Sequence, residues 1–120
     1  IMDFGVNLLF TSFWYEHRIS PAQDYSSHHE DMVLYGPLCM NIDVVRENVS
    51  LPLLQKGDRV VVHRVGAYNM TQWMQFIQMR PNVVLIDTRG QVHLIRRKED
   101  VQTLNSQELT PAYLEANKGS

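Results

Sequence analysis

The sequence predicts a mainly β domain, an antiparallel β-barrel or sandwich with one or two short helices. Short runs rich in valine, isoleucine and leucine alternate with turn residues, which is typical of strands joined by tight connections. The length of 120 residues fits one domain, and 44% apolar with 20% charged residues indicates a globular rather than a disordered chain. The sequence contains no internal repeat and no low-complexity segment.

The first 45 residues are predicted to contain two short strands after an apolar opening segment. Residues 1–19 are dense in apolar and aromatic side chains, and a strand or a short helix fits them equally well. Residues 20–30 are polar and predict a loop. Residues 32–35 predict a strand that a Gly-Pro pair ends, and residues 39–45 predict the next strand because β-branched side chains are frequent in them.

The middle of the chain contains the clearest strand signal. Residues 47–55 predict connecting chain and residues 56–58 predict a turn. Residues 59–65 predict a strand, and the consecutive valines in it indicate burial on both faces. Residues 66–69 interrupt this strand, and residues 71–78 predict one or two helical turns.

The last third of the chain predicts a hairpin followed by a short helix. Residues 83–87 and 91–96 flank a turn in which Gly90 can adopt a positive φ angle. Residues 100–104 predict a short helix. The polar residues from 105 to the end predict a flexible tail.

Charge and cysteine content argue against several classes of protein. The 11 Lys and Arg residues and 13 Asp and Glu residues give a net charge of −2, whereas nucleic-acid and membrane-surface binders usually carry a basic excess. Cys39 is the single cysteine and cannot form an internal disulfide, so nothing indicates an oxidising compartment. No apolar run approaches the roughly 18 residues of a membrane span, and the first residues lack signal-peptide features. We therefore expect a cytoplasmic protein without nucleic-acid or membrane partners.

Cys39 and Asp43 form the first group that could carry chemistry. In a strand, residues 39, 41 and 43 share a face, so the thiol and the carboxylate could point the same way. The structural alternatives are a small buried cysteine and a carboxylate that caps a neighbouring loop.

Two further groups contain polar side chains of interest. In the Gly-Ala-Tyr run at residues 66–68, the glycine allows a ligand to approach the backbone, and the Tyr68 phenol could donate to a phosphate or carboxylate oxygen. A turn with a core tyrosine fits the same residues. The His-His-Glu-Asp run at residues 28–31 offers potential metal ligands, but neighbouring side chains of an extended segment point to opposite faces, so we expect a solvated loop and no metal site.

Five short motifs occur in order along the chain. They are similar to the motifs D-x-G-[ML]-N, G-P-T-C-[ED]-x-x-D, L-x-x-G-D, G-A-Y and L-I-R-R-x-E, and they lie at residues 3–7, 36–43, 54–58, 66–68 and 94–99. Each motif is weak alone, but five of them in register are specific. Together they resemble the C-terminal part of the fold-type III amino-acid decarboxylases that depend on pyridoxal 5'-phosphate (PLP), the family of diaminopimelate and ornithine decarboxylases.

The resemblance implies a two-domain enzyme. Family members have an N-terminal TIM barrel, whose lysine forms a Schiff base with PLP, and a C-terminal Greek-key-like antiparallel β-barrel such as the one in alanine racemases. They are homodimers with active sites at the subunit interface. We therefore expect residues 1–19 to end the TIM-barrel region, residues 20–104 to form the C-terminal β-barrel and residues 105–120 to be the tail. Ile1 would then be a cut within a longer chain.

The resemblance also implies roles for single residues. Cys39 matches a cysteine that reaches into the partner's active site and protonates the carbanion left when CO₂ departs, and a thiol with an ordinary pKa near 8.5 suits this task. Tyr68 matches a tyrosine that contacts the cofactor phosphate, and Gly66 belongs to the same cofactor-binding block. Asp43 matches an acidic position near the subunit interface, with a supporting role.

The predicted substrate site, at Thr11, Tyr15 and Met40, departs from the family pattern. Met40 stands where the family has an acidic residue facing the substrate's distal ammonium, and an ammonium desolvated without a partner is costly. Thr11 stands where the pattern R-P-x-L-Y has the arginine for the distal carboxylate, whereas Tyr15 keeps the tyrosine. We therefore expect an amino-acid-type substrate that is less charged at its far end or is tethered to a carrier protein. An apolar wall of its pocket would include Trp73, Met74 and Phe76.

We therefore expect the C-terminal part of a PLP-dependent carboxy-lyase of amino-acid metabolism. None of Lys56, Lys98 and Lys118 matches the Schiff-base lysine, so this fragment alone is expected to be inactive. A non-catalytic β-barrel binding module and a racemase C-terminal domain are the alternatives. The motifs around Cys39 and at residues 66–68 favour a decarboxylase over a racemase, because they match the decarboxylase pattern.

Overall fold

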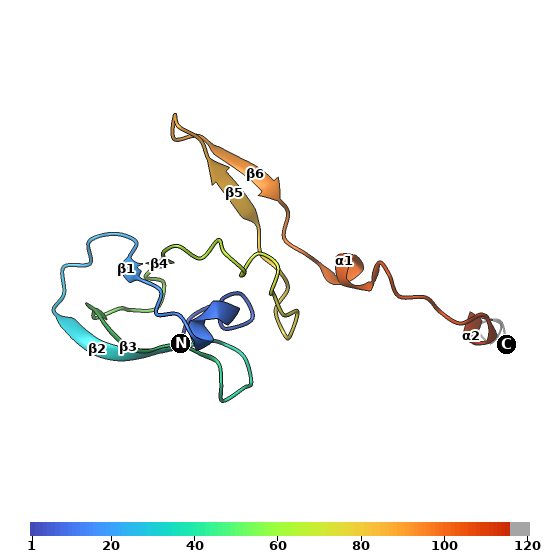
Figure 1. The fold of residues 1–120 in the computed structure, drawn as a ribbon, viewed down its shortest axis with the longest axis horizontal. Coiled ribbons are helices and arrows are strands. Elements are labelled where there is room, and N and C mark those ends of the chain that lie inside the picture. Colours follow the sequence, from blue (N-terminus) through green and yellow to red (C-terminus); the bar gives the residue numbers. More distant parts are fainter. Residues whose placement is uncertain (116–120) are drawn as a thin grey trace. The chain divides into compact units, whose positions relative to one another are not determined.

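The computed structural model describes residues 1–115, which form short strands and short helices (Figure 1). The chain divides into two compact units, Ile1–Gln78 and Met79–Ser120. The first unit contains the 3-10 helix η1 (Phe10–Phe13) and the strands β1 (Ile19–Pro21), β2 (His29–Tyr35), β3 (Val44–Pro52) and β4 (Val60–Val62). The second unit contains the strands β5 (Val83–Ile86) and β6 (Val92–Arg96) and the helices α1 (Val101–Asn105) and α2 (Ala112–Glu115).

All strands of the described chain pair antiparallel and in twos, β1 with β4, β2 with β3 and β5 with β6. The prediction of a mainly β domain with short helices is therefore confirmed. Within residues 1–115 these pairings do not close into a barrel. The predicted domain limits after residues 19 and 104 stay predictions, and the last five residues of the predicted tail lie outside the described residues.

One apolar cluster joins the two strand pairs of the first unit. Its buried members are Leu9, Leu34, Val45 and Leu51. Ile19 of β1 and the β4 residues Val60 and Val62 pack against this cluster. Burial of one such side chain contributes about 1.5–3 kcal/mol, so the shared cluster holds both pairs together.

Strand β3 begins later and runs further than the sequence predicts. Residues 39–43 form a turn rather than a strand, and β3 occupies most of the segment predicted as connecting chain. Polar, exposed residues in the middle of β3 hide its apolar pattern, while Val45 and Leu51 are buried in the core. Pairing with β2 thus overrides the weak local signal.

Other segments of the first unit also differ from the prediction. Strand β4 pairs only with β1, and Val61 is 43% exposed, so the predicted burial on both faces is wrong. Residues 71–78 form turns and bends instead of helical turns, because Ile77 has a φ of 67° and the Met74 N–H donates to the Asn7 carbonyl at 3.0 Å. The opening segment contains the short helix η1, and the loop predicted after it is shortened at both ends by β1 and β2.

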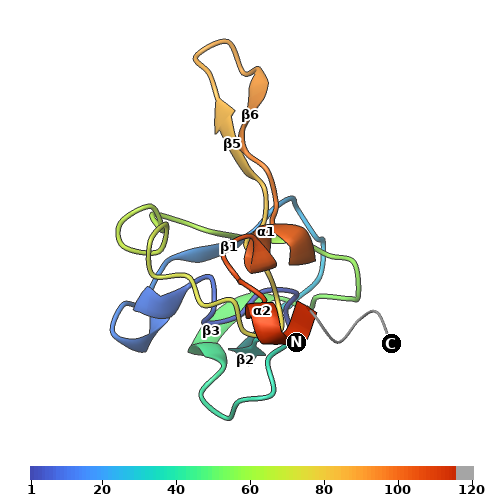
Figure 2. The same cartoon turned by 90° about the vertical axis from the view of Figure 1, so that its right-hand side faces the viewer.

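The second unit is a hairpin followed by two short helices (Figures 1 and 2). The hairpin is confirmed, and Gly90 in its turn has a φ of 78°. The Glu99 carboxylate accepts hydrogen bonds from the Arg80 backbone N–H, at 3.2 Å, and from the Arg80 guanidinium. The bond to the guanidinium raises the pKa of Arg80. The predicted helix α1 is confirmed, with Asp100 as its N-cap accepting the Thr103 N–H at 2.7 Å. No helix among the described residues is both long and apolar enough to cross a membrane.

Candidate active site

The Asp43 carboxylate organises the loop at residues 36–43, between β2 and β3. Asp43 is 2% exposed, and its two carboxylate oxygens accept separate N–H groups, Oδ1 that of Val6 at 2.8 Å and Oδ2 that of Leu38 at 2.7 Å. The main chain closes the same loop, because the Gly36 N–H donates to the Asp43 carbonyl at 2.9 Å and the Asp43 N–H donates to the Met40 carbonyl at 3.1 Å. The carboxylate therefore caps the loop and ties it to the start of the chain.

The Asp43 carboxylate occupies space that side chains at Gly5 and Gly36 would fill. A Cβ atom on Gly5 would stand 2.2 Å from Asp43 Oδ1, and a Cβ atom on Gly36 would stand 2.2 Å from Asp43 Oδ2. Any side chain at either position would displace the carboxylate or the backbone. Sequence reasoning misses this role of Gly5 and Gly36, and the glycines in the motifs at residues 3–7 and 36–43 are the signal that points to it.

Cys39 and Asp43 do not share an exposed face. Cys39 is exposed and follows Leu38, which is 7% exposed, whereas the Asp43 side chain points into the unit. The predicted common face is wrong because residues 39–43 form a turn, in which the alternation of a strand does not apply. The alternative of a carboxylate that caps a loop is confirmed, and the alternative of a buried cysteine is wrong.

Thr11 lies in a second buried polar network, which joins η1 to the segment after β4. Thr11 is 1% exposed, and its N–H and its hydroxyl both donate to Asn69 Oδ1, at 3.2 and 3.0 Å. Its Oγ1 also lies 2.6 Å from His17 Nε2. Tyr15 is 61% exposed and stacks on the His17 ring with a centroid distance of 5.8 Å. The Thr11 polar groups are thus engaged within the unit, whereas the Tyr15 side chain is accessible.

Tyr68 and Gly66 lie just before the buried Asn69. Tyr68 is 65% exposed and has a φ of 66°, and its carbonyl accepts the N–H groups of Thr71 and Gln72 at 3.0 and 2.9 Å. Because its side chain is exposed, the alternative of a core tyrosine is wrong. A Cβ atom on Gly66 would meet nothing within 4 Å. Both residues therefore face open space on the first unit.

A pocket of about 640 Å³ brings one predicted site residue near the Cys39 loop. Tyr15 lines it together with Asn41 and Ile42, which lie two and three residues after Cys39. Arg46 lines the same pocket and pairs with Glu16 at 3.0 Å. The structure thus places Tyr15 and the Cys39 loop around one hollow of the first unit.

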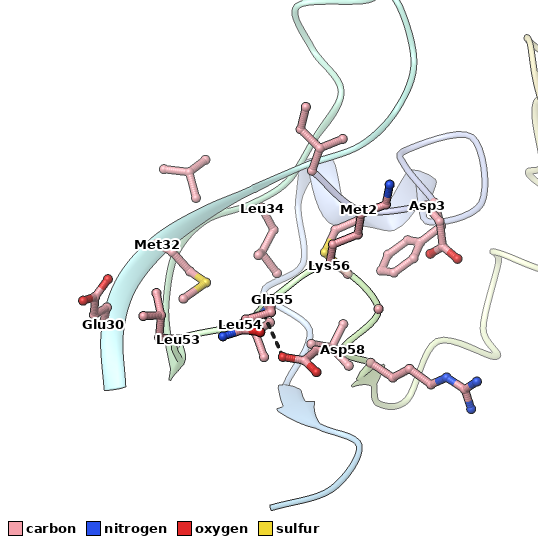
Figure 3. Close-up of a pocket in the computed structure, with 16 residues that line it drawn as sticks. Met2, Asp3, Glu30, Met32, Leu34, Leu53, Leu54, Gln55, Lys56 and Asp58 are labelled. Atoms are coloured by element: carbon pink, nitrogen blue, oxygen red, sulfur yellow. Dashed lines mark hydrogen bonds between the residues drawn. The ribbon is translucent and has the colours of Figure 1, made fainter. Parts of the chain in front are cut away.

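A second pocket, of about 890 Å³, contains none of the predicted site residues (Figure 3). Its lining comes from the first residues of the chain, from β2 and from the turn before β4. Figure 3 shows the Asp58 carboxylate among the lining residues, where it accepts the Gln55 N–H at 2.7 Å. Neither pocket is lined by Trp73, Met74 or Phe76, so the predicted apolar wall stays a prediction.

The His-His-Glu-Asp run at residues 28–31 lies mostly in β2 rather than in the predicted loop. Its side chains are exposed, and His28 Nε2 lies 2.7 Å from Glu30 Oε1. Within residues 1–115, no group of three or more His, Cys, Asp or Glu side chains could hold a metal ion.

Comparison with known proteins places this arrangement in a family. The family model described as "Pyridoxal-dependent decarboxylase, C-terminal sheet domain" matches residues 1–66. The chain is 34% identical to diaminopimelate decarboxylase of Streptomyces coelicolor over 126 aligned residues, which cover 92% of this chain and 28% of that protein. It is also 34% identical to diaminopimelate decarboxylase of Escherichia coli over 125 residues, which cover 91% of this chain and 29% of that protein.

A solved structure extends the match to most of the fold. The crystal structure of diaminopimelate decarboxylase from M. jannaschii in co-complex with L-lysine superimposes with a TM-score of 0.82 and 27% identity, over 93% of this chain and 26% of that chain. The chain thus spans little more than a quarter of the length of these relatives. It belongs to the family of pyridoxal-dependent decarboxylases, as their C-terminal sheet domain.

Proposed function

We propose that the full-length protein is a PLP-dependent carboxy-lyase that removes CO₂ from an amino-acid substrate. The observation that carries the proposal is the exposed Cys39 thiol on a loop inside the region that matches the family model. Because this chain spans 28% of the Streptomyces relative, the reaction belongs to the whole protein and not to this domain alone.

Tyr68 and Gly66 are the residues we assign to the cofactor phosphate. A phosphate needs a hydrogen-bond donor and room to approach, and the exposed phenol and the uncovered glycine backbone supply these. The residues present therefore fit the group. When bound, PLP withdraws the electron pair that stays on the substrate's α-carbon after CO₂ leaves. The lysine that would bind PLP covalently is assigned to the part of the protein outside this chain.

Cys39 is assigned the proton transfer that completes the reaction. A thiol is a proton donor, so the Cys39 S–H bond can break as its proton bonds to the α-carbon after CO₂ has left, and the thiolate that remains takes a proton from solvent. The exposure of Cys39 allows it to reach a group outside its own unit. We therefore propose a homodimer in which each Cys39 serves the active site of its partner.

The substrate we propose lacks one or both charges at its far end. The relatives are named diaminopimelate decarboxylases, and diaminopimelate carries an ammonium and a carboxylate at that end. Met40 has no charge to pair with the ammonium, and Thr11 is uncharged, 1% exposed and already hydrogen-bonded. Tyr15 is exposed and available for a polar group of the substrate. A less charged amino acid, or an aminoacyl group tethered to a carrier protein, satisfies these conditions.

The role of Cys39 is tested in the full-length protein with Cys39→Ala. The wild-type protein should show the absorbance of protein-bound PLP and release CO₂, and the variant should keep the absorbance while turnover falls about 100-fold or more. Ser26→Ala, which shortens an exposed side chain between β1 and β2, is the matched control with normal turnover. Normal turnover of Cys39→Ala would remove Cys39 from the reaction. Wild-type protein without PLP absorbance would favour a non-catalytic binding module.

The substrate is tested with Met40→Glu. Wild-type protein should turn over diaminopimelate poorly, and the variant should improve on it because the new carboxylate pairs with the distal ammonium. Thr11 is left unchanged, because a charged side chain at this buried position would break the network with Asn69. Efficient turnover of diaminopimelate by wild-type protein would overturn the substrate proposal and leave the reaction type intact.

A further inference from the structure

We infer that Asp43 is a positioning residue whose buried carboxylate holds the loop at residues 36–43 in the one conformation that presents the Cys39 thiol. The catalytic meaning of this inference rests on the proposed function of Cys39. The structural part, that the carboxylate fixes the loop, does not depend on it.

The Asp43 carboxylate binds backbone and not a cation. Among residues 1–115, none of the Lys, Arg or His side chains forms an ion pair with it, and its two oxygens accept the N–H groups of Val6 and Leu38. These two donors lie 37 and 5 positions away in the sequence. Hydrogen bonds to a charged acceptor are stronger than neutral ones, so the carboxylate clamps two separate pieces of main chain.

The position of the carboxylate is also fixed by packing. The Cβ positions of Gly5 and Gly36 lie 2.2 Å from different oxygens of the same carboxylate, so bare backbone covers it on both sides. A longer acid does not fit this space without moving the backbone at Gly5 or Gly36. The site therefore specifies the length of the side chain as well as its charge.

The constraint reaches Cys39 through one residue. The Leu38 N–H is held by the carboxylate and the Leu38 side chain is 7% exposed, so both the backbone and the side chain of this residue are anchored. Cys39 comes next and is exposed. The far end of the loop is closed by the Gly36–Asp43 main-chain hydrogen bond at 2.9 Å. The Cys39 backbone therefore lies between two anchored points of the loop, which limits the positions open to the thiol, as a proton donor needs.

The experiment uses Asp43→Asn in the full-length protein loaded with PLP. The asparagine oxygen can accept only one of the two N–H groups, and its NH₂ group faces the other, so one hydrogen bond must be lost. We expect the Val6 or the Leu38 amide to exchange its hydrogen about 10-fold faster or more. We also expect kcat to fall about 10- to 100-fold with KM and PLP absorbance near the wild-type values, because Cys39 acts after substrate has bound and CO₂ has left.

The matched control is Asp58→Asn. The Asp58 carboxylate also caps a turn of the first unit, but it accepts a single N–H, that of Gln55 at 2.7 Å. This variant should leave kcat and the exchange of the Leu38 amide unchanged. The inference is overturned when Asp43→Asn keeps the protection of both Val6 and Leu38, or when kcat stays within about twofold of the control. A variant that loses activity through KM alone, or without faster amide exchange, overturns it as well.

A second variant keeps the test decisive where Asp43→Asn does not fold. Gly36→Ala leaves the charge in place but pushes Oδ2 away from the Leu38 N–H, so it should reproduce the faster exchange and the lower kcat. Wild-type exchange and kcat in Gly36→Ala would contradict the inference. Failure of the proposed function can be told apart from failure of this inference. Full activity of Cys39→Ala would remove the catalytic role of Cys39, whereas the amide exchange of Asp43→Asn would still decide whether Asp43 fixes the loop.

Discussion

The loop at residues 36–43 and the hairpin turn at residues 87–91 are both organised by one aspartate that accepts two backbone N–H groups. Asp43 is 2% exposed and spreads its two donors over both oxygens, Oδ1 and Oδ2. The Asp87 side chain is 21% exposed. Both of its backbone donors, the N–H groups of Arg89 and Gln91, bond to the same oxygen, Oδ1, at 2.8 and 2.9 Å.

The two aspartates show that the same number of backbone N–H donors has different consequences. The donors of Asp87 lie two and four residues away, and water can replace the carboxylate in an exposed turn. One donor of Asp43 lies 37 residues away, and both bonds are buried, so no solvent is available when the carboxylate is lost. The first arrangement shapes a turn, whereas the second holds distant segments together.

The largest effect on stability is expected when the carboxylate at each site is replaced by an amide. Asp43→Asn should lower the free energy of unfolding by about 3 kcal/mol, because a buried N–H faces an NH₂ group after the exchange. Asp87→Asn should cost much less, because one amide oxygen has two lone pairs and can accept both N–H groups, and the exposed Arg89 and His93 side chains that lose their Oδ2 partner can turn to water. Urea unfolding of the full-length variants measures both values. Equal losses at the two sites would show that the distribution of donors over the oxygens does not matter.

A smaller but clear effect is expected from alanine at the glycines of the first unit. Gly5→Ala places a methyl group 2.2 Å from Asp43 Oδ1 and should cost about 2 kcal/mol of stability, since backbone and carboxylate must both move. Gly66→Ala is the matched control for stability, because its methyl group meets nothing within 4 Å. The midpoint of urea unfolding should therefore fall for Gly5→Ala alone. A similar fall for both variants would point to a general backbone effect instead of a clamp at Asp43.

The same contrast explains which parts of the fold the sequence predicts. The hairpin with Gly90 and the helix capped by Asp100 follow from residues within a few positions of each other, and both are found. The start of β3 and the turn before it depend on Val6, which no local pattern connects to Asp43. Local pattern therefore predicts a strand at residues 39–43, where the hydrogen bond between the Asp43 carboxylate and the distant Val6 N–H stabilises a turn.

The candidate site shows the same division. The motif around Cys39 identifies this residue as a candidate for catalysis, and the structure adds that its thiol is exposed. The burial of Thr11 against Asn69, 58 residues later, could not be inferred, because either residue alone fits an exposed polar position. Long-range polar networks thus account for most of what the sequence leaves open.

A modest effect on amide exchange is expected when the hairpin turn loses the Asp87 carboxylate completely. Asp87→Ala removes the partner of both N–H groups in the hairpin turn, and water should take its place. The amides of Arg89 and Gln91 should exchange a few-fold faster, with the exchange at Leu38 and Val6 unchanged. Site-resolved hydrogen exchange measures all four amides in one experiment. Loss of protection at Leu38 would mean that the two regions are coupled.

The smallest effect on stability is expected when low pH protonates Asp87 in the hairpin turn. The pKa of Asp87 is lowered, chiefly by the hydrogen bond from the Gln91 N–H and further by bonds from His93 and Arg89. Because the folded pKa lies below the unfolded one of about 3.9, the stabilisation is complete above that pH and is lost as the pH falls through the folded pKa. The Gln91 amide signal in an NMR titration should stay constant from about pH 7 to 5 and shift below about pH 4. Asp87→Asn should abolish the acid step, and an unchanged step in that variant would assign the titration to another group.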